Sequence, residues 1–509
     1  MRFNKIKNSL QKITNYEGAA AYQLSPALEL YTAVVTSSLS NQFYENAGDR
    51  LERIKSLIGK NEAEFVAKLA TYTREKMHLR SIPLVLTVEL AKQVNGNSLL
   101  SKTVDRVVQR ADEITELLAY YTLANDRKDT KKLNKLSKQL QKGLAKSFNK
   151  FDEYQFAKYN RATEVKLRDA LFLVHPKAKD EQQQALFNKI TNDTLSVPYT
   201  WETELSALGQ QAFANEQEKK AAFKAKWEEL IDSKKLGYMA LLRNLRNILE
   251  AGISTEHLVK VCMYLSDETA VKRSKQLPTR YLAAYRELKK LNHGHASVVL
   301  NALEDAVKVS VANMKGFGYD TRVLIACDVS GSMQQAISPK SKVLLYDIGL
   351  MLGMLLQYKC KNVISGMFGD RWKTIAMPSN NILSNVDEFY RREGEVGYST
   401  NGYLVIRDLV KRKEVVDKVM LFTDCQLWDS NGYNQAASNQ LQSQWKAYKK
   451  IAPQAKLYLF DLAGYGQVPL NVLRNDVHLI GGWSDKIFDV LQALEDGSNA
   501  LAEIEKIEL

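Results

Sequence analysis

The sequence changes its pattern at residues 313–321, NMKGFGYDT, where two glycines interrupt a long helical region. Before this point, apolar residues recur three and four positions apart, as in residues 64–76 and 236–252, which is the spacing of amphipathic helices. After it, short continuous apolar runs alternate with helical stretches, the pattern of strands buried on both faces of a sheet. The change predicts two domains, residues 1–315 and residues 319–509.

The first domain is predicted to be helical throughout. Roughly 300 residues of short helices without a strand favour stacked helical pairs, an α-solenoid, although no repeat recurs at a fixed period. Residues 236–252 illustrate the pattern, with a stop at Gly252. The apolar stripe of this segment comprises Tyr238, Leu241, Leu242, Leu245, Ile248 and Leu249.

The second domain is predicted to be an open, mostly parallel α/β sheet of the Rossmann-like kind. Its five candidate strands are RVLIACD, NVISGMFGD, KVMLFTD, AKLYLFDLAG and VHLIGG. The helices between them are expected at residues 340–357, 402–413 and 438–450. In such sheets ligands bind beyond the carboxyl ends of the strands, so those ends are where a site is expected.

Charge is divided unequally between the two domains. The whole chain of 509 residues carries a formal net charge of +13. Residues 1–318 contain 50 Lys and Arg against 36 Asp and Glu, a net of +14, whereas residues 319–509 contain 21 and 22. Because the whole excess lies in the first domain, a polyanionic partner is predicted for that domain alone.

Cysteine usage and hydropathy favour a cytoplasmic protein without a membrane segment. The four cysteines, at positions 262, 327, 360 and 425, have no CxxC spacing, so neither a disulfide framework nor a zinc site is expected. The first residues lack the apolar core of a signal peptide. No window approaches the roughly 18 apolar residues of a membrane span.

Oxygen-bearing side chains gather at two of the predicted strand ends. Asp328, Ser330 and Ser332 follow the first strand in CDVSGSM, and Asp424 ends KVMLFTD. Thr400 lies between them in the glycine-flanked loop GYSTNGYL. Such oxygens suit a hard divalent cation. In the alternative interpretation, Ser330 and Ser332 cap the helix that follows and Asp424 is a turn residue.

The Asp-x-Ser-x-Ser motif, with a Thr 68 residues later and an Asp 24 residues after that, resembles the metal-ion-dependent adhesion site of von Willebrand factor A domains. The resemblance implies that the hydroxyls of Ser330, Ser332 and Thr400 ligate Mg²⁺ or another divalent cation. Asp328 and Asp424 would act mainly through water. One coordination position would remain for an acidic oxygen from a partner.

Several helical segments resemble the TROVE family, which comprises the Ro autoantigen and its bacterial relatives. The similar segments are NYEGAAAYQLSP, LGYMALLRNLRNILEAG, QLPTRYLAAYREL and residues 156–177, where His-Pro-Lys stands in place of the family's His before Lys-Pro. The resemblance implies a ring of HEAT-like helical repeats, closed by the A domain and monomeric. It also implies binding of small structured Y RNAs and of the single-stranded 3′ ends of misfolded RNA.

By the same resemblance, Lys158, Arg161 and His175 contribute to the RNA surface. Basic side chains neutralise phosphates, and Arg or His also stacks on unpaired bases. The candidate RNA-binding set is completed by Lys131, Lys132, Lys135, Lys166 and Arg168. Two alternatives remain open: His175 as a packed core histidine, and the basic run 127–150 as a solvated helix face.

The basic run 127–150 also carries an apolar seam, which predicts that its helix docks and points its lysines outward. The seam comprises Leu133, Leu136, Leu140 and Leu144. The run precedes the segment 156–177 closely, so a continuous basic surface is predicted.

The chain contains no Walker A loop, Gly-x-Ser-x-Gly or HExxH motif, so no enzyme activity is expected. The leading hypothesis is a non-catalytic RNA-binding scaffold, partnered by a nuclease or by an acidic protein at the metal site. The alternative is a metal-dependent protein-adhesion module in which the helical half is only a scaffold.

Overall fold

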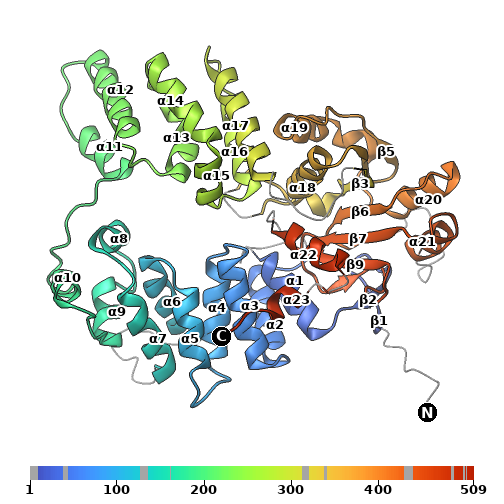
Figure 1. Ribbon diagram of the computed structural model, residues 1–509, viewed down its shortest axis with the longest axis horizontal. Helices are drawn as coiled ribbons and strands as arrows, with labels where there is room; N and C mark the ends of the chain where they lie inside the picture. The colour runs from blue at the N-terminus through green and yellow to red at the C-terminus, as the bar shows by residue number, and fades with distance from the viewer. Residues whose placement is uncertain are drawn as a thin grey trace. The chain divides into compact units, whose positions relative to one another are not determined.

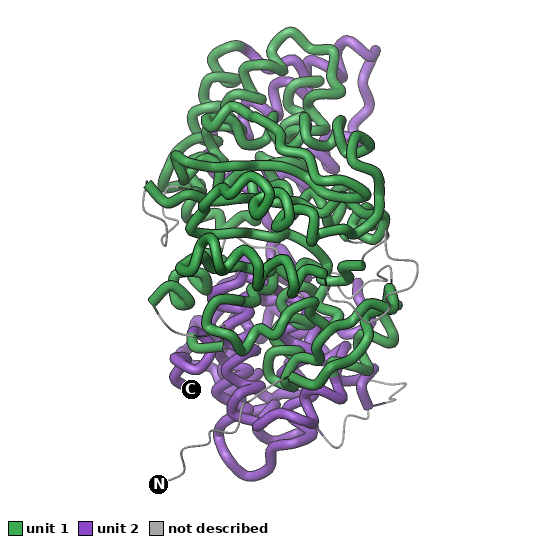
Figure 2. Tube along the Cα trace, turned by 90° about the vertical axis from the view of Figure 1, so that its right-hand side faces the viewer, with its two compact units in different colours: residues 1–54, 241–250, 255–502 green, residues 55–240, 251–254, 503–509 purple. Residues whose placement is uncertain are grey.

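The computed structural model divides the chain into two compact units, coloured separately in Figure 2. Unit 1 comprises residues 1–54, 241–250 and 255–502, and unit 2 comprises residues 55–240, 251–254 and 503–509. The structure describes residues 10–37, 44–125, 136–160, 162–311, 320–337, 341–428, 440–482, 486–496, 499 and 501–509. The predicted domain boundary between 315 and 319 lies outside the described residues.

Unit 2 is built from helices, as the sequence predicts for this region (Figure 1). They are α3 (Ala63–Glu75), α4 (Ser81–Leu90), α5 (Leu99–Val107), α6 (Ala111–Ala124), α7 (Lys138–Phe148), α8 (Glu153–Tyr159), α9 (Leu167–Val174), α10 (Glu181–Asn192), α11 (Trp201–Gly209) and α12 (Glu216–Asp232). Three further helices have residues in both units: α2 (Ala47–Gly59), α13 (Tyr238–Glu250) and α23 (Ala502–Glu505). Within unit 2, α3 packs on α4 and α5, α4 on α6, and α5 on α7.

The contact between α5 and α7 explains a glycine inside a helix. A Cβ atom added to Gly143 would lie 2.5 Å from Cβ of Val104, so only glycine allows this approach. Leu140 and Leu144 of the predicted seam are both fully buried beside it. The docking of this part of the basic run is therefore confirmed, whereas Leu133 lies outside the described residues.

The last helices of the helical region belong to unit 1. They are α14 (Thr255–Ser266), α15 (Glu268–Ser274), α16 (Pro278–Lys289) and α17 (Ala296–Val311). All six residues of the predicted stripe on α13 are buried, and the helix ends before Gly252, whose φ of +67° suits glycine. Helix α17 packs on α14, α15 and α16.

The α/β part of unit 1 contains a six-stranded sheet in the order β5-β4-β3-β6-β7-β9. Its strands are β3 (Arg322–Asp328), β4 (Asn362–Phe368), β5 (Trp372–Thr374), β6 (Lys418–Thr423), β7 (Lys456–Asp461) and β9 (Val477–Gly481). All neighbouring pairs are parallel except β4 with the short edge strand β5. The five predicted strands and the mostly parallel arrangement are therefore confirmed.

Helices cover both faces of this sheet, which explains why the strands read as continuous apolar runs. They are α18 (Leu345–Lys359), α19 (Leu383–Arg392), α20 (Tyr403–Arg412), α21 (Gln440–Ile451) and α22 (Ile487–Glu495). Side chains alternate along β3: Leu324 joins the core formed with α20 and α21, whereas Ile325 meets Gly353 of α18 on the other face. Helix α18 begins later than predicted, at Leu345.

The expectation of a wholly helical first region is wrong at the N-terminus. Strand β1 (Lys12–Thr14) pairs with β2 (Ala20–Gln23), and β2 pairs with β8 (Gln467–Val468), in a small antiparallel sheet. Strands β1 and β2 are too short to show the alternation of apolar and polar residues that is typical of a strand, and β8 lies more than 400 residues away in the sequence. The next element, α1 (Pro26–Val35), packs on β9.

Two glycines allow α1 to approach the sheet closely. A Cβ atom at Gly464, where φ is +68°, would lie 2.3 Å from the Thr36 hydroxyl oxygen. A Cβ atom at Gly481 would lie 3.0 Å from Val35. The N-terminal residues of the chain are therefore an integral layer of the α/β part of unit 1.

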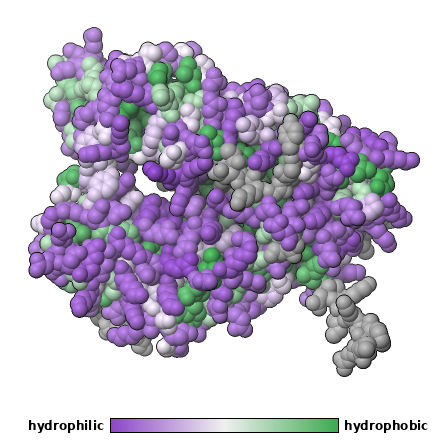
Figure 3. All heavy atoms as spheres, in the orientation of Figure 1, coloured by the Kyte–Doolittle hydropathy of each residue, from purple (hydrophilic) through white to green (hydrophobic). Residues whose placement is uncertain are grey.

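The remaining general expectations concern the cysteines and the surface. All four cysteines are free thiols, and three of them are buried. Within the described residues, no helix combines the length and the hydropathy needed to cross a bilayer. The face drawn in Figure 3 is mainly hydrophilic, with hydrophobic residues in scattered patches.

Candidate metal centre and nucleic-acid interface

Three neighbouring parallel strands, β3, β6 and β7, lead to buried aspartates at the same edge of the sheet (Figure 1). Asp328 is 1% exposed, and Asp424 and Asp461 are completely buried. The first two were predicted as site residues. Asp461 was not, although the run AKLYLFDLAG places it at a strand end in the same way.

Asp461 differs from the other two aspartates because a positive charge accompanies it. Burial raises the pKa of Asp461 to about 6, while the nearby Arg50 guanidinium acts in the opposite direction. Arg50 reaches this strand end from α2 and donates through Nη2 to the Ala463 carbonyl at 2.7 Å. The charge of Asp461 is therefore partly neutralised by Arg50.

The loop after β3 holds the first three predicted ligands together. The Ser330 N–H donates to Asp328 Oδ1 at 2.9 Å, and the Thr423 hydroxyl donates to Asp328 Oδ2 at 2.7 Å. The hydroxyl oxygens of Ser330 and Ser332 lie 3.3 Å apart. Ser330 precedes a short 3₁₀ helix, but its side chain makes no capping hydrogen bond to it. The capping alternative is therefore wrong for Ser330.

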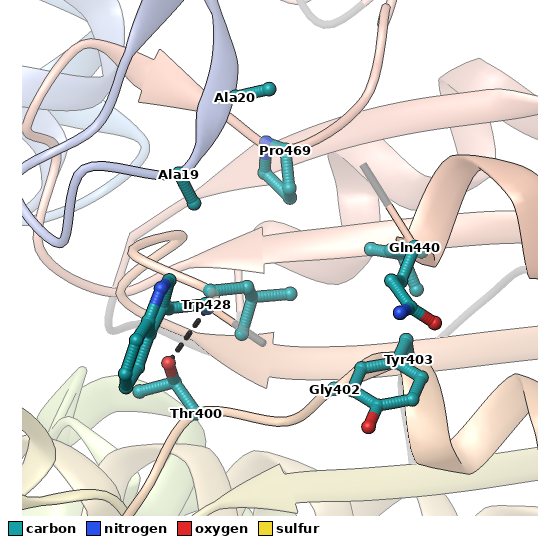
Figure 4. Close-up of a pocket in the computed structure, with 10 residues that line it drawn as sticks. Ala19, Ala20, Thr400, Gly402, Tyr403, Trp428, Gln440 and Pro469 are labelled. Carbon is teal, nitrogen blue, oxygen red and sulfur yellow. Dashed lines mark hydrogen bonds between the residues drawn. The ribbon is translucent and has the colours of Figure 1, made fainter. Parts of the chain in front are cut away.

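Asp424 and Thr400 complete the predicted set from the other side. Asp424 Oδ1 accepts the Gln426 N–H at 3.0 Å, while Oδ2 is buried and has no hydrogen-bond partner in the described part of the chain. Thr400 Oγ1 accepts the Trp428 N–H at 2.8 Å, as the dashed line in Figure 4 marks. The hydrogen bond from the Gln426 N–H is one that a turn residue would form. However, Asp424 is completely buried and its Oδ2 has no hydrogen-bond partner in the described part of the chain, which does not fit a simple surface turn.

The loop that carries Thr400 is fixed by backbone contacts. A Cβ atom at Gly397, where φ is +73°, would collide with the Asp370 carboxylate, so this turn requires glycine. Asp370 Oδ1 accepts the Ser399 N–H at 3.0 Å. The Gly331 N–H donates to the Tyr398 carbonyl at 3.2 Å, which joins the serine loop to the threonine loop.

Burial dominates the electrostatics of the site. It raises the pKa of Asp328, and the charge of Asp424 raises it further, because two carboxylates in a dry environment disfavour joint ionisation. Burial also raises the pKa of Asp424, while the Ser332 hydroxyl and the Gln426 N–H partly offset this. Neither carboxylate forms a salt bridge within the described residues.

The residues at this edge fit a divalent cation. A buried carboxylate oxygen without a hydrogen-bond partner and a pair of buried, unneutralised carboxylates both cost free energy, and a bound cation would remove that cost. Each hydroxyl oxygen also has a second lone pair that can bind the cation. Across the described ranges, no group of three or more His, Cys, Asp or Glu side chains could hold a metal ion. A cation here would therefore depend on the three hydroxyls.

A small pocket lies beside Thr400 (Figure 4). Its volume of about 30 Å³ holds roughly one water molecule. The lining residues are Ala19, Ala20, Thr400, Gly402, Tyr403, Leu427, Trp428, Gln440, Leu441 and Pro469. Two of these residues come from the N-terminal segment, which the sequence did not connect with the site.

The second candidate site lies on α8 and α9 of unit 2. Lys166 and Arg168 are exposed, and Lys158 lies near two aromatic rings, 5.7 Å from the centroid of Tyr154 and 5.8 Å from that of Tyr159. His175 is exposed at the end of α9, in the left-handed conformation with φ of +49°. The packed-core alternative for His175 is therefore wrong. Arg161, Lys131, Lys132 and Lys135 lie outside the described residues.

The described end of the basic run lies next to this segment. Lys142 and Lys146 of α7 are exposed on the side opposite its buried leucines. Gln141 Nε2 donates to the Leu173 carbonyl of α9 at 3.1 Å, so the two helices are in direct contact. The structure thereby brings lysines of α7 and the basic residues of α9 onto adjoining surfaces.

Comparison with known proteins extends these observations. The family model described as the TROVE domain matches residues 32–195 and 191–311, more than half of the chain. Telomerase protein component 1 of Mus musculus is 25% identical over 347 residues, covering 52% of this chain, and that of Rattus norvegicus is 24% identical. The chain spans only 13% of the length of these relatives.

Among solved structures, the crystal structure of the Deinococcus radiodurans Ro (RSR) protein is similar, with a TM-score of 0.59 and 17% identity. The similarity covers 93% of this chain and 100% of that chain. It confirms the predicted fold class, helical repeats followed by an open α/β sheet, over nearly the whole sequence.

Proposed function

The chain belongs to the TROVE family, and from that membership we propose that it is a non-catalytic RNA-binding protein that serves as a ribonucleoprotein scaffold. The observation that carries the proposal is the group of basic residues on α8 and α9, which lies inside the family-matched region. Lys166, Arg168 and His175 are exposed there, and so is the ring of Tyr154, close to Lys158. Phosphate contacts from such side chains supply affinity, and exposed aromatic rings accept unpaired bases.

The charge distribution supports the same assignment. The excess of positive charge lies in residues 1–318, and the α/β region is nearly neutral. A helical region that served only as a scaffold for adhesion would have no use for this excess. Protein adhesion through the metal site therefore stands as the alternative, and it would gain support if RNA binding were absent.

The RNA class follows from the family resemblance. Small structured non-coding RNA of the Y type would bind the exposed basic surface. Single-stranded 3′ ends of misfolded RNA would enter the central hole of a monomeric ring. Filter binding with the full-length protein tests this. RNA with a free single-stranded 3′ tail should bind more tightly than the same RNA with its end base-paired, and equal affinities would contradict entry of the tail.

The candidate metal centre would give the protein a second binding function. Ser330, Ser332 and Thr400 would hold Mg²⁺ or a similar cation directly, with Asp328 and Asp424 acting through water. When bound, the cation would supply positive charge that attracts a carboxylate oxygen. The partner would be an acidic protein surface, such as that of a nuclease recruited to the RNA in the cytoplasm. Loss of a copurifying protein on replacement of Asp328, with RNA binding retained, tests this role.

A further inference from the structure

A short N-terminal segment, residues 15–17, lies against the loop that follows Asp424. The Asn15 side chain donates through Nδ2 to the Leu427 carbonyl at 2.9 Å. The Tyr16 N–H donates to Gln426 Oε1 at 2.9 Å. Since the Gln426 N–H in turn binds Asp424 Oδ1, a single residue separates this segment from a candidate ligand.

Tyr44 connects Glu17 to the serine loop. Its hydroxyl donates a hydrogen bond to Glu17 Oε1 and also forms a hydrogen bond with Ser332. The Tyr44 ring stacks on Tyr16, with centroids 5.2 Å apart, and meets the edge of Tyr465 at 5.4 Å. This aromatic cluster holds the Tyr44 hydroxyl, and with it the Glu17 carboxylate, beside the metal centre.

Glu17 carries an unneutralised charge at this place. It is only half-buried, and within the described residues it forms no salt bridge. A single hydroxyl, that of Tyr44, separates its carboxylate from the Ser332 hydroxyl. A third carboxylate beside two buried acids is unfavourable in the metal-free protein, because like charges in a poorly solvated site repel. A bound cation would turn that repulsion into attraction.

We propose that Glu17 caps the metal centre from within the chain, facing the position that an acidic residue of a partner would otherwise take. The inference rests on the proposed metal centre and adds its regulation. An acidic partner must displace Glu17, and with it the contact to Tyr44, before its own carboxylate reaches the cation. When no partner is present, Glu17 takes the position of the partner's carboxylate, and this prevents indiscriminate binding of acidic proteins.

The test uses the full-length protein with Mn²⁺ as the cation and acetate as a minimal carboxylate partner. Mn²⁺ binding is measured by electron paramagnetic resonance, and acetate binding to the Mn²⁺-loaded protein by calorimetry. Glu17→Gln should weaken Mn²⁺ binding and strengthen acetate binding, each by about tenfold, a difference of 1.4 kcal/mol. Tyr44→Phe, which keeps all charges, should also strengthen acetate binding because Glu17 loses its anchor.

Two further variants separate this inference from the metal centre itself. Glu64→Gln, which removes an exposed acid from α3, should leave both affinities as they are in the wild type. Asp328→Asn should weaken Mn²⁺ binding whether or not Glu17 is present. If Asp328→Asn weakens binding but Glu17→Gln changes neither affinity, the cap is refuted and the metal centre stands. If the wild type does not bind Mn²⁺, both are refuted.

Discussion

Arg286 and Asp347 form a bidentate ion pair between α16 and α18. Their Nη1–Oδ2 and Nη2–Oδ1 distances are both 2.7 Å. Asp347 is completely buried, and its Oδ2 also accepts the Leu344 N–H at the start of α18. Because α16 is one of the last helices of the helical region and α18 is the first long helix of the α/β region, the pair joins the two regions within unit 1.

The pair should be strongly coupled. Arg286→Met leaves the buried Asp347 carboxylate unpaired, and such a loss costs roughly 3–5 kcal/mol. The double variant with Asp347→Leu should be less destabilised than the sum of the single variants, since it leaves no buried charge. Urea unfolding monitored by tryptophan fluorescence provides the comparison. Lys260→Ala, which breaks an exposed pair with Glu256 on α14, should cost less than about 1 kcal/mol. Additive effects of the single variants would contradict the coupling.

If the proposed metal centre binds a cation, replacing one of its residues should lower the affinity for the metal without lowering the stability of the metal-free protein. Asp328→Asn should weaken Mn²⁺ binding by about 10–100-fold, the range seen when a residue acting through bound water is replaced. Because burial raises the pKa of Asp328, its ionised form costs folding free energy, and the metal-free variant should melt no lower than the wild type. Asp461→Asn, at the neighbouring strand end, is the matched control and should retain Mn²⁺ affinity. Equal affinity in the wild type and Asp328→Asn would refute the site.

His478 on β9 should make stability depend on pH. Burial, with the charge of Lys456, lowers the pKa of His478 from 6.5 to about 4. Between these values the unfolded chain binds more protons than the folded chain, so the free energy of unfolding falls as pH decreases from 6.5 towards 4. Because His478 is only partly buried and solvent screens part of the effect, the contribution is on the order of 2 kcal/mol. His478→Gln should flatten this part of the profile, measured by urea unfolding from pH 4 to 7. A profile identical to the wild type would contradict the assignment.

The sequence predicted the elements whose patterns are long. The stripe on α13 and the five apolar strands are visible because many residues repeat one spacing. The residues of the candidate metal centre stand out for a similar reason, since Asp328 and Asp424 lie where parallel strands end and Thr400 has the matching spacing, and their binding of a cation stays a prediction. Parallel order then places these ends at one edge of the sheet.

What the sequence did not predict are the contacts between distant residues. Glu304 of α17 accepts three N–H groups at the start of α19, from Ile382, Leu383 and Ser384, and thereby replaces a missing local cap. No local pattern marks such an acid, because its partners lie about 80 residues away. Glu17 likewise lies in a short segment without periodicity, and only the folded chain brings it beside Asp424.

The proposed RNA surface should give a specific change in the salt dependence of RNA binding. Replacing Lys166 and Arg168 together with Ala should weaken RNA binding, and the slope of the logarithm of affinity against the logarithm of salt concentration should fall by about 0.7–0.9 for each lost phosphate contact. Filter binding over a range of salt concentrations measures both quantities.

A matched control removes the same charge elsewhere in unit 2. Lys219 and Lys220 are exposed on α12, and replacing both with Ala lowers the net charge by the same amount. If the phosphates contact α9, only the first double variant should change the salt slope, because counterions are released where the backbone is bound. Equal losses in the two double variants would mean that the overall charge of the helical region, and not the surface of α8 and α9, attracts the RNA.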